Sequence, residues 1–150
     1  MKPADPTPFQ PPPVKPLVLG ESIGLQQTDT EGLIGALKRG LPAKSFEQLR
    51  GVLRLSKAEL AEVVGISERT LIRRMNTGRF TAFESERLYR IARLADKAKD
   101  VLEDSQEAAV WLKTSKRYLN GKTPLQYADT EVGAQTVERL LGRIEHGVFS

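Results

Sequence analysis

The fold is decided by residues 56–76, which read SKAELAEVVGISERTLIRRMN. Ser56 and Glu59 have the Ser-x-x-Glu spacing of a capping box, in which each side chain accepts a hydrogen bond from the other residue's backbone amide. This spacing predicts a helix that starts after Ser56, and Gly65 supplies a sharp turn at its end. The apolar side of this helix consists of Leu60, Ala61, Val63 and Val64.

A second short helix follows the turn. Ser67 is a good N-cap residue for a helix that runs from Glu68 to about Met75. Leu71, Ile72 and Met75 are predicted to point inward. Two short helices joined by a turn that contains glycine have the layout of a helix-turn-helix.

In such a motif the second helix faces base edges in the major groove of DNA. Residues 69–93 contain seven arginines against two glutamates, a local balance of +5 in a chain whose net charge is +4. Arginine binds guanine at two points, whereas phosphate contacts position a protein without reading sequence. The predicted DNA contacts are Lys57, Ser67, Arg69, Thr70, Arg73, Arg74 and Arg79. Base contact and phosphate contact both stay open for Arg73 and Arg74, and a helical hairpin that merely packs is the alternative for the motif.

Helical patterns cover most of the remaining chain. Helices are predicted over 30–39, 45–53, 82–102 and 105–118, and over a last segment that Thr130 begins and Gly147 ends. Apolar residues recur at spacings of three and four in the helix over 82–102, which suits an intramolecular core. A dimer coiled coil is the alternative, although the pattern covers barely two heptads. No strand pattern competes with these helices.

These patterns predict an all-α protein with three parts. Seven of the nine prolines lie in the first 16 residues, which favours an extended or disordered segment, and we assign 1–29 to a Pro-rich N-terminal tail. A helical domain with the helix-turn-helix is predicted over 30–103, and a small helical domain over 104–150.

Composition excludes several classes of protein. The chain has no cysteine and a single histidine, so disulfides, iron–sulfur clusters and the common zinc sites are excluded. No apolar run approaches the roughly 20 residues of a membrane span, and the N-terminus lacks the pattern of a signal peptide. No catalytic constellation accompanies the histidine. We expect a soluble cytoplasmic protein of 150 residues that needs no cofactor or metal and is not an enzyme.

Two sets of spaced residues are more specific than any single motif. The first consists of Ser67-Glu68-Arg69-Thr70-Leu71-Ile72-Arg73-Arg74 and Phe83-Glu84-Ser85-Glu86-Arg87-Leu88. The second consists of Trp111-Leu112, Leu119-x-Gly121-x-x-Pro124-Leu125, Thr130-x-x-Gly133-x-x-x-Val137 and Arg143-Ile144-Glu145-His146-Gly147-Val148. The helix-turn-helix resembles the Cro/repressor type. The first set resembles the middle of the Xre/MbcA/ParS antitoxin family, and the second is similar to that family's toxin-binding domain.

This resemblance implies an antitoxin that neutralises a RES-domain toxin, an enzyme that consumes NAD⁺, by packing its C-terminal segment over the toxin's active-site cleft. It also implies repression of the antitoxin's own operon. We expect a homodimer within a larger toxin–antitoxin complex, which places its two second helices on operator DNA. The alternative is a stand-alone dimeric helix-turn-helix repressor whose C-terminal half only dimerises.

The predicted toxin contacts lie in the C-terminal third of the chain. They are Trp111, Arg139, Arg143, Glu145, His146, Val148, Phe149 and Ser150. A place in the core is the alternative for Trp111, and a solvated helix face is the alternative for Arg143.

Overall fold

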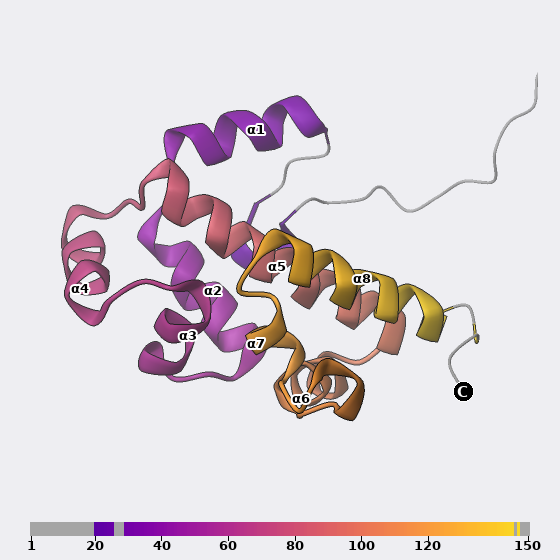
Figure 1. The fold of residues 1–150 in the computed structure, drawn as a ribbon. Helices are drawn as coiled ribbons and strands as arrows, with labels where there is room; N and C mark the ends of the chain where they lie inside the picture. Colours follow the sequence, from indigo (N-terminus) through magenta and orange to yellow (C-terminus); the bar gives the residue numbers. More distant parts are fainter. Residues whose placement is uncertain (1–19, 26–28, 146, 148–150) are drawn as a thin grey trace, which may run out of the picture.

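The computed structural model describes residues 20–25, 29–145 and 147. Within these ranges the chain is helical, and its β contact is an isolated bridge between Pro42 and Arg79. The elements are η1 (Glu21–Ile23), α1 (Thr30–Arg39), α2 (Ala43–Leu53), α3 (Lys57–Val64), α4 (Glu68–Thr77), α5 (Ala82–Leu102), α6 (Ser105–Lys113), η2 (Arg117–Leu119), α7 (Pro124–Tyr127) and α8 (Glu131–Glu145). The prediction of an all-α fold is confirmed (Figure 1).

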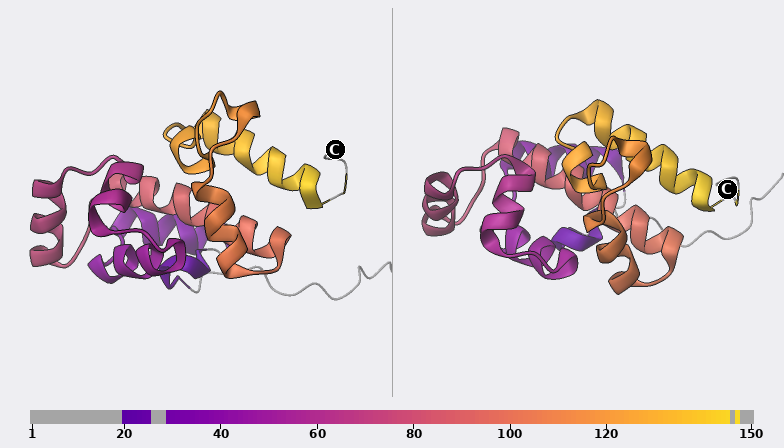
Figure 2. Two further views of the ribbon diagram at one scale, coloured as in Figure 1. Left: turned by 90° about the horizontal axis from the view of Figure 1, so that it is seen from below. Right: turned by 60° about the horizontal axis from the view of Figure 1, so that its bottom comes forward.

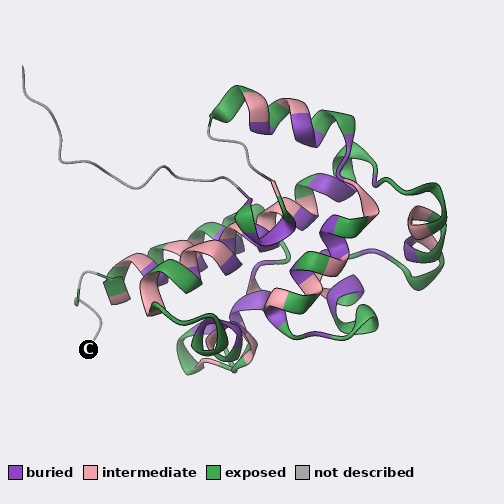
Figure 3. Ribbon diagram, turned by 180° about the vertical axis from the view of Figure 1, so that it is seen from behind, coloured by how far each residue is buried: buried purple, intermediate pink, exposed green. Residues whose placement is uncertain are grey.

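The 21-residue helix α5 forms the axis of the molecule (Figures 1 and 2). It packs against η1, α1, α2, α3, α6 and α8. Four residues of the apolar series in this helix, Leu88, Ile91, Ala95 and Ala98, are between 0 and 3% exposed. The last member, Leu102, is half-buried against the same cluster, so the apolar seam belongs to the intramolecular core. Buried residues of both predicted domains join in one cluster around this helix (Figure 3).

Local capping signals explain where several helices begin. The hydroxyl of Ser56 accepts from the amide of Glu59 at 3.1 Å, and the Glu59 carboxylate accepts from the amide of Ser56 at 2.9 Å, which confirms the predicted capping box. Thr81 and Glu84 form a second capping box at the start of α5, whose predicted bounds are also confirmed. Thr130 caps α8 as predicted by accepting an amide hydrogen bond at 3.0 Å.

Helix α1 has the predicted bounds, whereas α2 begins earlier than predicted. The N-cap residue of α1 is Asp29, because its carboxylate accepts a hydrogen bond of 2.9 Å from a backbone amide of the first turn. Helix α2 begins at Ala43, directly after the extended residue Pro42, and Ser45 is buried within its first turn.

Helix α6 ends at Lys113 and is therefore shorter than the helix predicted to reach Tyr118. Thr114 has an extended backbone, and its hydroxyl donates to the carbonyl of Val110 at 2.6 Å. The chain then turns through η2, which buries Leu119 at 1% exposure. Burial of this side chain overrides the helical pattern of the sequence. The short helix α7 follows, in a segment for which no helix was predicted.

The predicted tail over 1–29 contains a segment that is part of the fold. Residues 20–25 turn back onto α5, and Ile23 is 1% exposed. The hydroxyl of Ser22 donates to a backbone carbonyl of α5 at 3.2 Å, and its amide donates to the carboxylate of Asp96 at 3.0 Å. The assignment of this segment to the tail is therefore wrong, and most of the remaining tail lies outside the described residues.

Candidate nucleic-acid interface

Helices α3 and α4 form the predicted helix-turn-helix. Gly65 has a φ of +70°, a backbone conformation that glycine adopts without strain. The next amide, of Ile66, donates to the carbonyl of Ala61 at 2.9 Å and closes the turn. Both helices and the turn between them contribute buried residues that fix the crossing of the helices, namely Leu60, Ala61, Val64, Ile66 and Leu71.

Helix α4 lies at the opposite end of the molecule from the C-terminal end of α8 (Figures 1 and 2). Leu71 is the buried residue of this helix, and Arg74 and Met75 are half-buried on the same side. Ile72 is 57% exposed, so the prediction that it points inward is wrong. Successive residues of a helix are rotated by about 100°, and the stripe on which α4 rests is too narrow to include Ile72.

The outer face of α4 is basic and open. Arg69, Ile72, Arg73 and Asn76 are exposed and have the spacing that places them on one face of a helix. Arg69 and Arg73 make no ion pair or hydrogen bond with the residues that the structure describes. Their guanidinium groups are available to an anionic partner.

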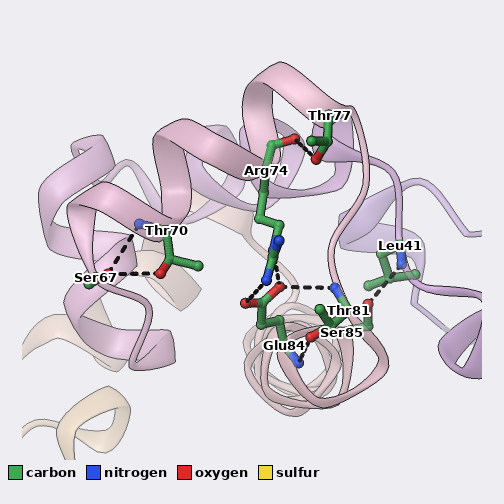
Figure 4. Close-up of polar contacts among 8 residues, drawn as sticks. All are labelled: Leu41, Ser67, Thr70, Arg74, Thr77, Thr81, Glu84 and Ser85. Carbon is green, nitrogen blue, oxygen red and sulfur yellow. Dashed lines mark hydrogen bonds and ion pairs between the residues drawn. The ribbon is translucent and has the colours of Figure 1, made fainter.

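The first turn of α4 is held by two of the predicted contact residues (Figure 4). The hydroxyl of Ser67 accepts from the amide of Thr70 at 3.1 Å and donates to its hydroxyl at 3.0 Å. Ser67 is exposed and Thr70 half-buried, so both combine a capping role with access to a partner. Lys57, at the start of α3, is exposed with its ammonium 3.7 Å from the carboxylate of Glu47.

Two other predicted DNA contacts are occupied within the chain. Arg74 binds Glu84 of α5 through Nε–Oε1 at 2.7 Å and Nη2–Oε2 at 3.1 Å (Figure 4). Burial raises the pKa of Glu84, but hydrogen bonds from Arg74 and Thr81 outweigh it and hold the pKa below its usual value. Arg79 donates to the carbonyl of Gly40. The pair between Arg74 and Glu84 thus links α4 to α5.

The predicted toxin contacts on α8 lie along its outer side. Arg139 and Arg143 are exposed and four residues apart, and Glu145 is exposed at the end of the helix. Val132, on the first turn of α8, is 72% exposed. The predicted contacts His146, Val148, Phe149 and Ser150 lie outside the described residues.

Trp111 differs from these arginines because it is half-buried and packs against the core from α6. The ammonium of Lys116 lies 4.9 Å from the centre of its ring, in cation–π geometry. Burial lowers the pKa of Lys116. Trp111 thus packs against the edge of the core, with one face of its ring covered by a neighbouring lysine.

A network of ion pairs joins α5 to α8. Arg93 binds Glu131 at 2.6 Å and Glu138 at 2.5 Å, and Arg90 binds Glu131 at 3.3 Å. Together with Arg74, three of the seven arginines in the basic window are paired with glutamates. The formal charge of the window therefore overstates the positive surface that is open to a partner.

The described residues contain neither a metal-binding cluster nor a membrane-spanning helix. They contain no group of three His, Asp or Glu side chains placed to hold a metal ion, and no helix among them has the length and apolar character needed to cross a membrane.

Comparison with known proteins agrees with this architecture. Residues 32–93 match the antitoxin Xre-like helix-turn-helix domain, and residues 97–147 match the antitoxin Xre/MbcA/ParS C-terminal toxin-binding domain. The chain is 36% identical to Antitoxin Xre of Yersinia enterocolitica over 141 residues, which cover 93% of this chain and 95% of that protein.

Two further relatives extend the comparison. Antitoxin Xre of Photorhabdus laumondii is 36% identical over 134 residues, which cover 88% of this chain and 90% of that protein. The Prs ADP-ribosylating antitoxin of a Sphingobium strain is 24% identical over 127 residues, which cover 78% of this chain and 80% of that protein. The family resemblance predicted from the sequence is confirmed, and the chain belongs to the Xre family of antitoxins.

Proposed function

We propose that this antitoxin acts in the cytoplasm and neutralises a RES-domain toxin that consumes NAD⁺. The C-terminal region covers the substrate cleft of the toxin and takes no part in chemistry, so neutralisation is stoichiometric. The observation that carries this proposal is the exposed pair Arg139 and Arg143 on α8, within the segment that matches the toxin-binding domain. Arginine binds carboxylates at two points, so this pair suits acidic groups beside the cleft of a toxin. The name of the Sphingobium relative refers to ADP-ribosylation, a reaction that consumes NAD⁺, which supports the same toxin class.

We further propose that the protein represses its own operon as a homodimer. Two copies of α4 enter successive major grooves about 34 Å apart, as in other dimeric helix-turn-helix proteins. The exposed and unpaired side chains of Arg69 and Arg73 support this surface. The ion pair between Arg74 and Glu84 links α4 to α5 on the opposite side from this surface.

The toxin proposal is tested with charge reversals on α8. Removing this helix would expose the core, since Val137 and Leu141 are both fully buried. The better variant is Arg139→Glu combined with Arg143→Glu, and Lys38→Glu on the exposed side of α1 is the matched control. Tagged full-length chain is used to recover its partner from the native host.

We expect the parent and the control to recover a near-stoichiometric neighbour-encoded protein and to suppress its consumption of NAD⁺. The double variant is expected to lose both effects at an unchanged melting temperature. Recovery of the antitoxin alone, bound to DNA, would instead support the stand-alone repressor whose C-terminal half only dimerises. A partner that does not consume NAD⁺ would refute the assignment to the RES class.

The DNA proposal is tested with Arg73→Ala on a fragment from upstream of the antitoxin gene. A base contact predicts a loss of about 1–3 kcal/mol in binding free energy, and a phosphate contact predicts a salt slope smaller by about 1. Lys38→Ala is the control. Unchanged affinity and an unchanged salt slope would show that Arg73 does not contact the DNA.

A further inference from the structure

Ile72 lies on the open face of α4. It is 57% exposed and lies next to Arg69 of the preceding turn, while the buried side of α4 is formed around Leu71. An isoleucine at this position adds nothing to the core of the protein. Its β-branched side chain also lowers helix propensity slightly relative to alanine. The exposed position therefore calls for an explanation outside the folded chain.

The charges around Ile72 indicate the chemistry of its partner. Its charged neighbours one turn earlier are Arg69 and Glu68, which are both exposed, and Arg73 is exposed on the same open face. Arg69 and Arg73 are unpaired within the described residues, so a partner that covers this face has to accept two guanidinium groups. A second copy of the same face would bring the arginines of both copies together and is disfavoured by repulsion. A partner with negative charge and small apolar groups is required.

The major groove of DNA has this combination. Guanine offers two acceptors to an arginine, and thymine displays its 5-methyl group to apolar side chains. We propose that Ile72 contacts the 5-methyl group of a thymine in the operator, next to the contact made by Arg69. This inference rests on the proposed binding of DNA by α4 and makes it more specific.

The proposal predicts a feature of the operator. Residues at positions i, i+3 and i+4 of a helix are neighbours on its surface, so the bases that they contact are close together. Each half-site should contain a thymine within about two base pairs of a guanine, and the methyl group of this thymine should contribute to affinity.

The methyl group can be removed without changing base pairing, because uracil pairs like thymine. The probe is the DNA fragment from upstream of the antitoxin gene, in which each thymine is replaced by uracil in turn. Full-length parent protein is compared with Ile72→Ala, and Ile34→Ala, on α1 with a side chain that is 39% exposed, is the matched control. Melting temperatures confirm that the variants are folded.

For the parent protein and for Ile34→Ala, we expect uracil at one thymine of a single half-site to lower affinity about fourfold. Uracil at the equivalent thymine of both half-sites should lower affinity about fifteenfold. For Ile72→Ala, the same substitutions should have no effect, because the contact is already absent. This non-additivity is the signature of a direct contact.

Three results would overturn the inference, and they are distinguishable. If uracil lowers the affinity of Ile72→Ala as much as that of the parent, Ile72 does not contact a thymine although the protein binds DNA. If Ile72→Ala weakens self-association and leaves the uracil pattern unchanged, the residue belongs to an interface between copies. If the parent binds neither this fragment nor any sequence selected from a random DNA library, the proposed DNA binding fails as well.

Discussion

Gly133 offers a sharp test of how α8 docks onto the rest of the protein. This buried glycine lies in the first turn of α8, where a Cβ atom would be 1.8 Å from the carbonyl oxygen of Tyr127, the last residue of α7. Such contacts are essentially never shorter than 3.0 Å, so Gly133→Ala has to separate the two helices by at least 1.2 Å at this point. The Tyr127 backbone is itself held by a hydrogen bond of 2.9 Å to Thr123 and cannot rotate away freely.

We expect Gly133→Ala to lower the free energy of unfolding by about 1–3 kcal/mol, the usual range for overpacking in a core. In a chain of this length, this corresponds to a fall of about 3–10 °C in melting temperature. Thermal unfolding followed by circular dichroism measures the change. The sequence pattern that resembles the antitoxin family includes this glycine, and the close approach of α7 gives a physical reason for it.

Gly142→Ala is the matched control. Gly142 lies on the same helix, and a Cβ atom there would meet nothing within 4 Å. Because alanine favours helix more than glycine does, this variant should unfold at the same or a higher temperature, with a gain of at most about 1 kcal/mol. If Gly133→Ala and Gly142→Ala have the same melting temperature, α8 does not approach α7 as closely as described, and the reasoning is refuted.

Two further predictions concern the carboxylates of Asp96, which is half-buried, and Glu84, which is buried. Burial raises the pKa of Asp96 to about 6, against hydrogen bonds from Ser22 that lower it. The folded chain therefore holds a proton that the unfolded chain has released between about pH 4 and pH 6, and stability falls as pH rises through this window. Asp96→Asn should be more stable than the parent at pH 7.5, and this difference in stability should disappear at pH 4. Urea unfolding at the two pH values measures the difference, and an equal difference at pH 7.5 and pH 4 would contradict the prediction. Glu84→Gln removes the charge opposite Arg74 and should lower the melting temperature, whereas Glu62→Gln on the exposed side of α3 should not; equal melting curves would show that the ion pair does not stabilise α4.

The sequence by itself predicted those features that depend on neighbouring residues. The capping box at Ser56 and Glu59, the turn at Gly65 and the bounds of the helix over 82–102 follow from side chains within one or two helical turns. The spaced residues of the C-terminal half were sufficient to recognise the antitoxin family.

The tertiary structure decided which residues face solvent and which charges are already paired. Ile72 points outward because α4 rests on a narrow stripe around Leu71, and α6 stops early because the chain turns to bury Leu119. Arg74, Arg90 and Arg93 find glutamates on other segments, 10 to 45 residues away. A hydrophobic pattern gives the period of a helix but not the width of its contact, and the partner of a charge is set by packing between helices. The size of the basic surface is therefore a property of the folded chain.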